Sequence, residues 1–249
     1  MITPFQIALQ ILEWVDAIAL IGLMLIAVGF LTLPMLYLRQ RRVWANRAQA
    51  GAAVAMANPP RVLVQLPVYN EPEVVAGLLE CMAALDWPRD RLHVQLLDDS
   101  TDETVEIARA KIAELRARGL DIEHVRREHR AGFKAAALAE GLARCDAPVL
   151  AILDADFRPP AHWLKVVVPK LMADPKAAFV QSRCELANRD QNWLTRAQSL
   201  LFDSHYVLEQ GVRAEAGFPI QFNGTGAVWR RARPAPAHSG CRTAGSAPG

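Results

Sequence analysis

Residues 93–103, HVQLLDDSTDE, decide the fold. The run HVQLL is short and apolar enough for a buried strand, and two carboxylates, Asp98 and Asp99, follow it at once. Ser100 and Glu103 have the spacing of a capping box, in which a serine caps a helix and a glutamate three residues later bonds back to the cap. We therefore expect a strand that ends at the two carboxylates, a polar loop, and a helix behind Ser100.

The same alternation of strand and helix continues in both directions. Behind the capping box, Val105, Ala108, Ile112 and Leu115 share one apolar helix face. Alternating elements of this kind favour a mostly parallel sheet covered by helices on both faces. We predict strands over 61–66, 93–97, 122–126, 149–153 and 177–181, and helices over 72–85, 133–144 and 162–172.

Polar clusters follow three of the predicted strands. They are Tyr69-Asn-Glu71, Asp98-Asp-Ser100 and Asp154-Ala-Asp156. Because ligands of open α/β sheets bind outside the carboxyl ends of the strands, the three clusters are expected to contribute to one ligand site.

Asp154 and Asp156 are open to two interpretations. In an extended segment, residues two apart point the same way, so both carboxylates can face one ion. Mg²⁺ in proteins is commonly held by one or two carboxylates together with substrate phosphates. The alternative is a plain turn, since aspartate is common in turns and Arg158-Pro-Pro160 follows.

Lys134 stands at the start of an alanine-rich helix, where the helix dipole disfavours a cation. A phosphate would be stabilised there by the amine and by the helix amides, although a solvated surface lysine is an alternative.

The adjacent carboxylates Asp98 and Asp99 repel each other, and capping of the next helix explains only one of them. Asn223-Gly-Thr-Gly226 is expected to form a tight loop.

Residues 17–38, AIALIGLMLIAVGFLTLPMLYL, contain no charged residue. About 20 apolar residues span a bilayer as a helix. The positive-inside rule places the side that carries Arg39, Arg41, Arg42 and Arg47 in the cytoplasm. A cleaved signal peptide would carry its positive charge before the apolar core, and a buried core helix is the other alternative. We expect a membrane anchor within residues 1–38, followed by a basic juxtamembrane linker over residues 39–60.

Several function classes lack support. The formal net charge of +2 does not favour a nucleic-acid binder. The four cysteines are far apart and form no C-x-x-C pair, so reduced, packing thiols are expected. The motifs of P-loop NTPases, dinucleotide dehydrogenases and common hydrolases are missing.

Together the motifs resemble glycosyltransferase family 2, in particular its membrane-bound processive branch of cellulose and glucomannan synthases. The resemblance covers about residues 60–231. It rests on VQLPVYNE (64–71), DDSTD (98–102), RAGFKA (130–135), LDAD (153–156), FVQSR (179–183), NR (188–189) and FNGTG (222–226), which occur in the family's order.

The resemblance implies a GT-A-type domain over residues 61–231 and an inverting transfer of a hexose from a nucleotide sugar to a growing β-glycan. The domain would lie on the cytoplasmic side of the inner membrane, in contact with the lipid bilayer, a UDP- or GDP-hexose and a polysaccharide acceptor. The implied site residues are Tyr69 and Glu71 at the base and ribose, Asp98 and Asp99 at the nucleotide, Lys134 at the diphosphate, and Asp154 and Asp156 at a Mg²⁺ or Mn²⁺ ion.

The chain departs from the family in its last part. The T-E-D and Q-x-x-R-W motifs are absent, and Ala136 stands where the family often has glycine. Inversion by direct displacement needs a positioned base, and no residue matches that role, so no catalytic residue is assigned. Two alternatives remain: a non-catalytic nucleotide-sugar-binding protein, and a metal-dependent phosphohydrolase, which requires further ligands near Asp154.

Residues 232–249 contain no Val, Ile, Leu, Met, Phe, Trp or Tyr, so they are expected to be disordered. Their Ala, Pro, Arg and Gly content is typical of out-of-frame translation of a GC-rich gene. We predict that this tail results from out-of-frame translation or from a gene truncation. In the case of a frameshift, the DNA after codon 231 encodes T-E-D and Q-x-x-R-W in another reading frame. Sequencing tests this, and finding neither motif would contradict the frameshift.

Overall fold

The structure is a computed structural model that describes residues 3–50, 56–127 and 129–231. The described residues divide into two compact units. One contains residues 3–50 and 183–222, and the other contains residues 56–182 and 223–231. The tail predicted over residues 232–249, with Cys241, lies outside the described residues. Cys81, Cys145 and Cys184 are free thiols.

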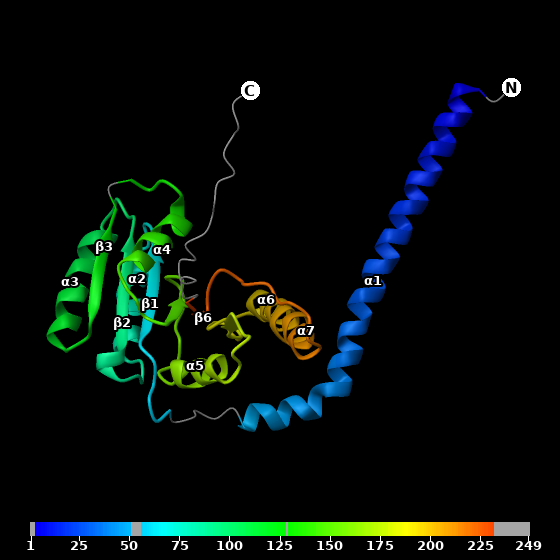
Figure 1. Ribbon diagram of the computed structural model, residues 1–249. Coiled ribbons are helices and arrows are strands. Elements are labelled where there is room, and N and C mark those ends of the chain that lie inside the picture. The colour runs from blue at the N-terminus through cyan, green and yellow to red at the C-terminus, as the bar shows by residue number, and fades with distance from the viewer. Residues whose placement is uncertain (1–2, 51–55, 128, 232–249) are drawn as a thin grey trace, which may run out of the picture. The chain divides into compact units, whose positions relative to one another are not determined.

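The second unit is built on a six-stranded sheet in the order β3-β2-β1-β4-β6-β5 (Figure 1). β1 is parallel to β2 and β4, and β2 is parallel to β3, whereas β6 is antiparallel to β4 and β5. The predicted mostly parallel sheet is confirmed. The strands are β1 (Val62–Val68), β2 (Leu92–Asp98), β3 (Ile122–Arg126), β4 (Val149–Ile152), β5 (Phe179–Gln181) and β6 (Ala227–Arg230).

Helices cover both faces of the sheet. The larger core joins β1, β2 and β4 to α2 (Pro72–Ala83), α3 (Thr104–Ala117) and α5 (Trp163–Ala173). The opposite face carries α4 (Phe133–Ala143), whose Ala137 packs with Leu97 and Val125. A short helix, η1 (Arg89–Arg91), precedes β2. Since both faces are covered, the central strands are buried almost throughout, as their apolar sequences predict.

A buried amide network lies under α4. Gln65 Nε2 donates to Gln95 Oε1 and to the Leu138 carbonyl, both at 3.1 Å. Gln95 Nε2 in turn donates to Glu123 Oε2 at 3.1 Å. A Cβ added at Gly141 would stand 2.6 Å from Gln65 Nε2 and 2.7 Å from Gln95 Oε1. Only glycine therefore lets α4 approach the sheet at this point.

The first unit contains α1 (Pro4–Ala50), α6 (Trp193–Asp203), the π-helix η2 (Ser204–Gly211) and α7 (Val212–Glu215). By length and composition, residues 4–39 of α1 make a helix that is able to cross a membrane. The apolar side chains of its middle part, such as Leu23, Met24 and Leu25, are exposed. The helix continues to Ala50, through the first part of the predicted linker.

The predicted capping box at Ser100 and Glu103 is wrong. Helix α3 begins at Thr104, and Glu103 stands at its N-cap without a side-chain bond to the helix. The Ser100 hydroxyl accepts instead from the Asn70 backbone N–H at 2.9 Å, because it belongs to the loops at the sheet edge. A capping box does occur at Asn192 and Thr195, where α6 begins.

Two further predictions need correction. β1 was expected to end before Pro67, but it runs to Val68, which pairs with Asp98 of β2. The elements α6, η2, α7 and β6 were not predicted. Strand β6 is short and directly follows Gly226, and it is a strand only because it pairs with β4 and β5.

The glycine at position 141 provides a test of the packing. Gly141→Ala is expected to destabilise the fold by about 1–3 kcal/mol, because the new methyl group overlaps the glutamine network. The control is Ala139→Gly on the exposed face of the same helix, which should cost about 1 kcal/mol through helix propensity alone. Chemical denaturation measures both. A Gly141→Ala protein more stable than the wild type would contradict the packing described.

Candidate functional site

A pocket of about 250 Å³ lies at the carboxyl ends of β1, β2 and β4. Of the residues predicted from the sequence, Tyr69, Glu71, Asp99, Lys134 and Asp154 line it, whereas Asp98 and Asp156 do not. The other lining residues are Pro67, Val68, Leu97, Arg130, Ala137 and Ala155. Each of the three polar clusters therefore contributes at least one predicted residue to the pocket, and Lys134 joins them.

Asp154 and Asp156 lie in a turn and not in an extended segment. The Phe157 backbone N–H donates to the Asp154 carbonyl at 3.1 Å and closes the turn. Asp154 is half-buried, and its backbone N–H donates to Thr225 Oγ1 at 2.8 Å, whereas Asp156 is exposed. The premise that alternation along a strand aligns the two carboxylates is thus wrong. The turn and a ligand site are compatible, because the turn leaves Asp154 on the pocket wall.

Lys134 is held by two acceptors from other parts of the chain. Its ammonium group donates to Asp154 Oδ1 and to the Gly224 carbonyl, the latter at 2.9 Å. The residues before it make this possible, since Gly132 and Phe133 have φ angles of 71° and 50° and turn the chain into α4. The cation at the unfavourable end of the helix therefore has an anionic partner and is not a freely solvated surface lysine.

The loop over residues 223–226 is tight, as predicted. Gly224 and Gly226 have φ angles of 85° and 68°, values that glycine adopts without strain. Through its Gly224 carbonyl and the Thr225 hydroxyl, the loop contacts Lys134 and Asp154. These contacts connect the 223–226 loop to the pocket at the carboxyl ends of β1, β2 and β4.

Glu71 carries an unusual charge environment. Partial burial raises the pKa of its carboxyl group, and the negative charges of Asp156 and Asp154 raise it further. The backbone N–H of Tyr69 and the charge of Lys134 oppose the increase only in part. An added cation near these three carboxylates would therefore lower the pKa of Glu71.

Asp99 is paired with Arg127, a residue that the sequence did not single out. The guanidinium Nε donates to Asp99 Oδ1 at 2.8 Å, and an Nη donates to Oδ2. Both side chains are more than nine-tenths buried, at 8% and 7% exposure. The bond to Asp99 raises the pKa of Arg127. Arg127 also donates to the carbonyls of Ala131 and Phe133, so it ties Asp99 to the loop that leads into α4.

Asp98 lies behind the pocket and is fully buried. Its Oδ1 accepts from the Ser100 backbone N–H and its Oδ2 from His124 Nε2, each at 2.8 Å. Burial alone would raise the pKa of Asp98, but the bonds from His124 and Ser100 outweigh it and hold the pKa below its usual value. The structure thus gives Asp98 internal partners in place of an exposed face.

Arg130 covers an aromatic ring of the pocket. Its guanidinium carbon lies 3.4 Å from the centroid of the Tyr69 ring and 5.1 Å from that of Phe133. Such cation–π contacts contribute roughly 0.5–2 kcal/mol. The stack fixes one face of Tyr69 and places a positive charge beside Lys134 on the pocket wall.

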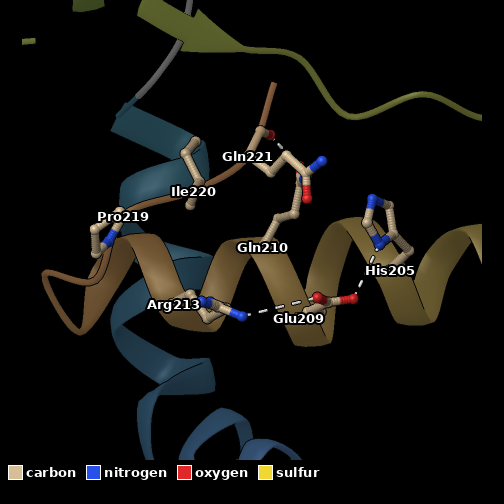
Figure 2. Close-up of a pocket in the computed structure, with 7 residues that line it drawn as sticks. All are labelled: His205, Glu209, Gln210, Arg213, Pro219, Ile220 and Gln221. Atoms are coloured by element: carbon tan, nitrogen blue, oxygen red, sulfur yellow. Dashed lines mark hydrogen bonds and ion pairs between the residues drawn. The ribbon is translucent and has the colours of Figure 1, made fainter. Parts of the chain in front are cut away.

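A separate pocket of about 220 Å³ lies within the unit that contains residues 183–222 (Figure 2). Glu209 in its wall has two partners at i ± 4: His205 Nδ1 lies 3.0 Å from Oε2 and an Arg213 nitrogen lies 3.9 Å from Oε1. Gln210 Nε2 donates to the Gln221 carbonyl at 3.1 Å. The wall includes part of the π-helix, and π-helical turns are frequent at functional sites.

The donor set fits a hydrated cation better than a closed metal cage. Within residues 3–50, 56–127 and 129–231, no group of three His, Cys, Asp or Glu side chains is placed to hold a metal. The charges of Asp154 and Asp156 both act on Glu71, and carboxylates of this kind suit an ion whose other ligands are water and phosphate.

The Arg127–Asp99 pair is expected to be important for stability. Arg127→Ala should destabilise the fold by roughly 3 kcal/mol, because it leaves a buried carboxylate without its partner. The matched control is Arg109→Ala, which breaks an exposed ion pair with Glu106 and should cost no more than about 1 kcal/mol. Chemical denaturation of both variants tests this, and equal losses would contradict a structural role for the buried pair.

Comparison with known proteins shows the family of the chain. The family model "Glycosyl transferase family 2" matches residues 64–231. Glucomannan 4-beta-mannosyltransferase 2 of Arabidopsis thaliana is 41% identical over 180 residues, which are 70% of this chain and 33% of the relative. Glucomannan 4-beta-mannosyltransferase 1 of Cyamopsis tetragonoloba is 38% identical over 175 residues, 69% of this chain and 33% of the relative. The chain spans about a third of the length of these curated relatives.

A solved structure is also similar. It is the mannosyltransferase PcManGT from Pyrobaculum calidifontis in complex with GDP-Man and Mn²⁺, with a TM-score of 0.57 and 26% sequence identity. The match covers 81% of this chain and 55% of that chain. The mostly parallel sheet flanked by helices is thus of the GT-A type. The chain belongs to glycosyl transferase family 2.

Proposed function

We propose that this chain binds a nucleotide sugar as part of an enzyme that transfers a hexose to a growing β-glycan with inversion. The observation that carries the proposal is the pocket in which Lys134 and Asp154 meet beside Asp99, Tyr69 and Glu71. The relatives named as glucomannan mannosyltransferases, and the similar structure with GDP-Man and Mn²⁺, favour GDP-mannose over a UDP-hexose as the donor.

The proposed role of each pocket residue follows from the chemistry of its side chain. Tyr69 and Glu71 lie where a base and ribose are expected, and Asp99 supplies a carboxylate for donor groups of the base. Lys134 is the cation nearest to the expected diphosphate. Asp154 and Asp156 would hold Mn²⁺ or Mg²⁺, which as a Lewis acid stabilises the charge that the departing diphosphate gains.

Donor binding requires a rearrangement of one ion pair. In the structure Lys134 neutralises Asp154. A cation bound at Asp154 would release the lysine to the diphosphate, since two cations do not share one carboxylate favourably. The negative charges of Asp154 and Asp156 contribute to the raised pKa of Glu71, and a bound cation would offset them.

Binding without transfer by this chain is the second candidate. Direct displacement needs a base that takes the acceptor proton. The sequence contains neither T-E-D nor Q-x-x-R-W, the motifs that the family resemblance associates with that step. We therefore expect donor binding to be measurable on this chain and sugar transfer to be very slow.

The apolar helix completes the proposal. We propose that α1 crosses the inner membrane, with the arginines that follow residue 38 on the cytoplasmic side. The sugar-nucleotide pocket would then lie in the cytoplasm, where its donor is found, and a β-glycan would be the acceptor.

Calorimetric titration of the purified full chain tests donor binding. GDP-mannose should bind in the presence of Mn²⁺ and more weakly after its removal by chelation. Lys134→Ala and Asp156→Asn should each weaken binding roughly tenfold, or about 1.4 kcal/mol. Asp90→Asn, at a carboxylate that pairs with Arg91 away from the pocket, is the control and should bind as the wild type does.

Two outcomes would contradict the proposal. The first is that neither GDP-mannose nor UDP-glucose shows saturable binding. The second is that Asp90→Asn weakens binding as much as Lys134→Ala and Asp156→Asn do. Transfer of labelled mannose to a mannan acceptor separates the two candidates, because efficient transfer would show that the chain contains its own base.

A further inference from the structure

Asp98 is a buried charge that the proposed function does not use directly. Its side chain has no exposed surface, and both of its oxygens accept hydrogen bonds. An ionised carboxylate only accepts, so His124 Nε2 must carry the proton of their bond. The guanidinium of Arg126 adds a third group, with a nitrogen 3.7 Å from Asp98 Oδ2. Such a carboxylate meets a ligand only by giving up these partners.

The bonds of Asp98 continue into the loops that form the pocket. Ser100, whose backbone N–H donates to Asp98, uses its hydroxyl to accept from the Asn70 backbone N–H at 2.9 Å. Asn70 Oδ1 accepts in return from the Thr101 backbone N–H at 2.9 Å. Arg126 donates to the Ser100 carbonyl at 2.9 Å and fixes the same turn from β3.

This network holds a residue with a positive φ angle between two pocket residues. Asn70 has a φ angle of 55°, in the left-handed region that asparagine adopts more readily than most residues other than glycine. It lies between Tyr69 and Glu71, and both of these line the pocket. Asp99, the next pocket residue, stands between Asp98 and Ser100. The network therefore fixes the backbone that carries three pocket side chains, those of Tyr69, Glu71 and Asp99.

A purely structural role explains this arrangement poorly. A buried charge is often no more stabilising than apolar residues of similar volume, and removal of one partner is costly. The strand end beside Asp98 is otherwise apolar, with Leu96 and Leu97 buried. A charge at position 98, directly before Asp99, is useful if it orients the loops that form the pocket.

We propose that His124 and Asp98 are positioning residues that hold the 69–71 and 99–101 loops in the geometry that binds the donor. The proposal rests on the proposed function for its ligand. Neither side chain needs to touch the nucleotide sugar. This replaces the expectation that Asp98 contacts the nucleotide.

The chain contains a second histidine–aspartate pair that serves as a control. His93 Nδ1 lies 2.8 Å from Asp121 Oδ2, the same separation as in the His124–Asp98 pair, but this pair is more exposed and stands at the opposite end of β2 from the pocket. His124→Leu removes the donor to Asp98, and His124→Gln keeps an N–H donor. His93→Leu removes a histidine–aspartate bond that no pocket residue depends on.

Donor affinity is measured by calorimetry with GDP-mannose and Mn²⁺, well below the unfolding temperature of every variant. We expect His124→Leu to weaken binding at least about tenfold, His124→Gln to recover most of the loss, and His93→Leu to have no effect. Wild-type affinity in His124→Leu, or an equal loss in His93→Leu, would overturn the proposal.

Asn70→Gly provides a second variant if His124→Leu does not fold. Glycine tolerates the φ angle but removes the acceptor for Thr101, so the variant should weaken donor binding. Wild-type donor affinity in Asn70→Gly would contradict the role of the network.

A readout without donor separates this inference from the proposed function. Hydrogen exchange of the amides of residues 69–71 and 99–101 should quicken in His124→Leu and stay unchanged in His93→Leu. If the wild type bound no nucleotide sugar but exchange changed in this way, the proposed function would fail while the positioning network stood. Unchanged exchange at these amides would overturn the network itself.

Discussion

The parallel pairing of β1 with both β2 and β4 is the constraint on which the site depends. In that register Val68 stands opposite Asp98, and Gln65 stands opposite Ile152, two residues before Asp154. Parallel strands end at the same edge of a sheet, so the polar residues that follow each strand are brought within contact distance of one another. The core fixes this register, since the central strands are buried on both faces and a slip by one residue would exchange those faces.

The same strand pairing also brings several carboxylates together at this edge, and their negative charge must be neutralised. Three of the carboxylates at the edge have a cationic or donating side chain as partner: Asp98 has His124, Asp99 has Arg127, and Asp154 has Lys134. Two of these partnerships are enclosed and fix the loops, whereas that of Lys134 is half-exposed and open to exchange. The two buried pairs therefore act as a rigid support, whereas the half-exposed Lys134–Asp154 pair can exchange partners. This arrangement suits a site that admits a charged donor.

Local patterns in the sequence predicted much of the sheet, and tertiary contacts account for the rest. The apolar runs of β1 to β4 and the cluster positions behind them were predictable, because burial on both faces requires those residues. Arg127 was not, because an arginine after a strand has no distinguishing feature until the fold sets it against Asp99. The capping box failed for the same reason, since the Ser100 hydroxyl is used by Asn70 on a different strand end. Helix α7 and strand β6 are only four residues long, too short to show a periodic pattern, whereas the amphipathic pattern of α6 was overlooked.

The central claim is that this edge binds a nucleotide sugar on an exchangeable Lys134–Asp154 pair supported by a rigid Asp98 and Asp99. The most direct test is a structure of the chain with GDP-mannose and Mn²⁺. The account predicts that Lys134 Nζ leaves Asp154 for a diphosphate oxygen, while Asp98 keeps its bonds to His124 and Ser100. A donor bound away from this edge, or one contacted by Asp98 itself, would contradict it.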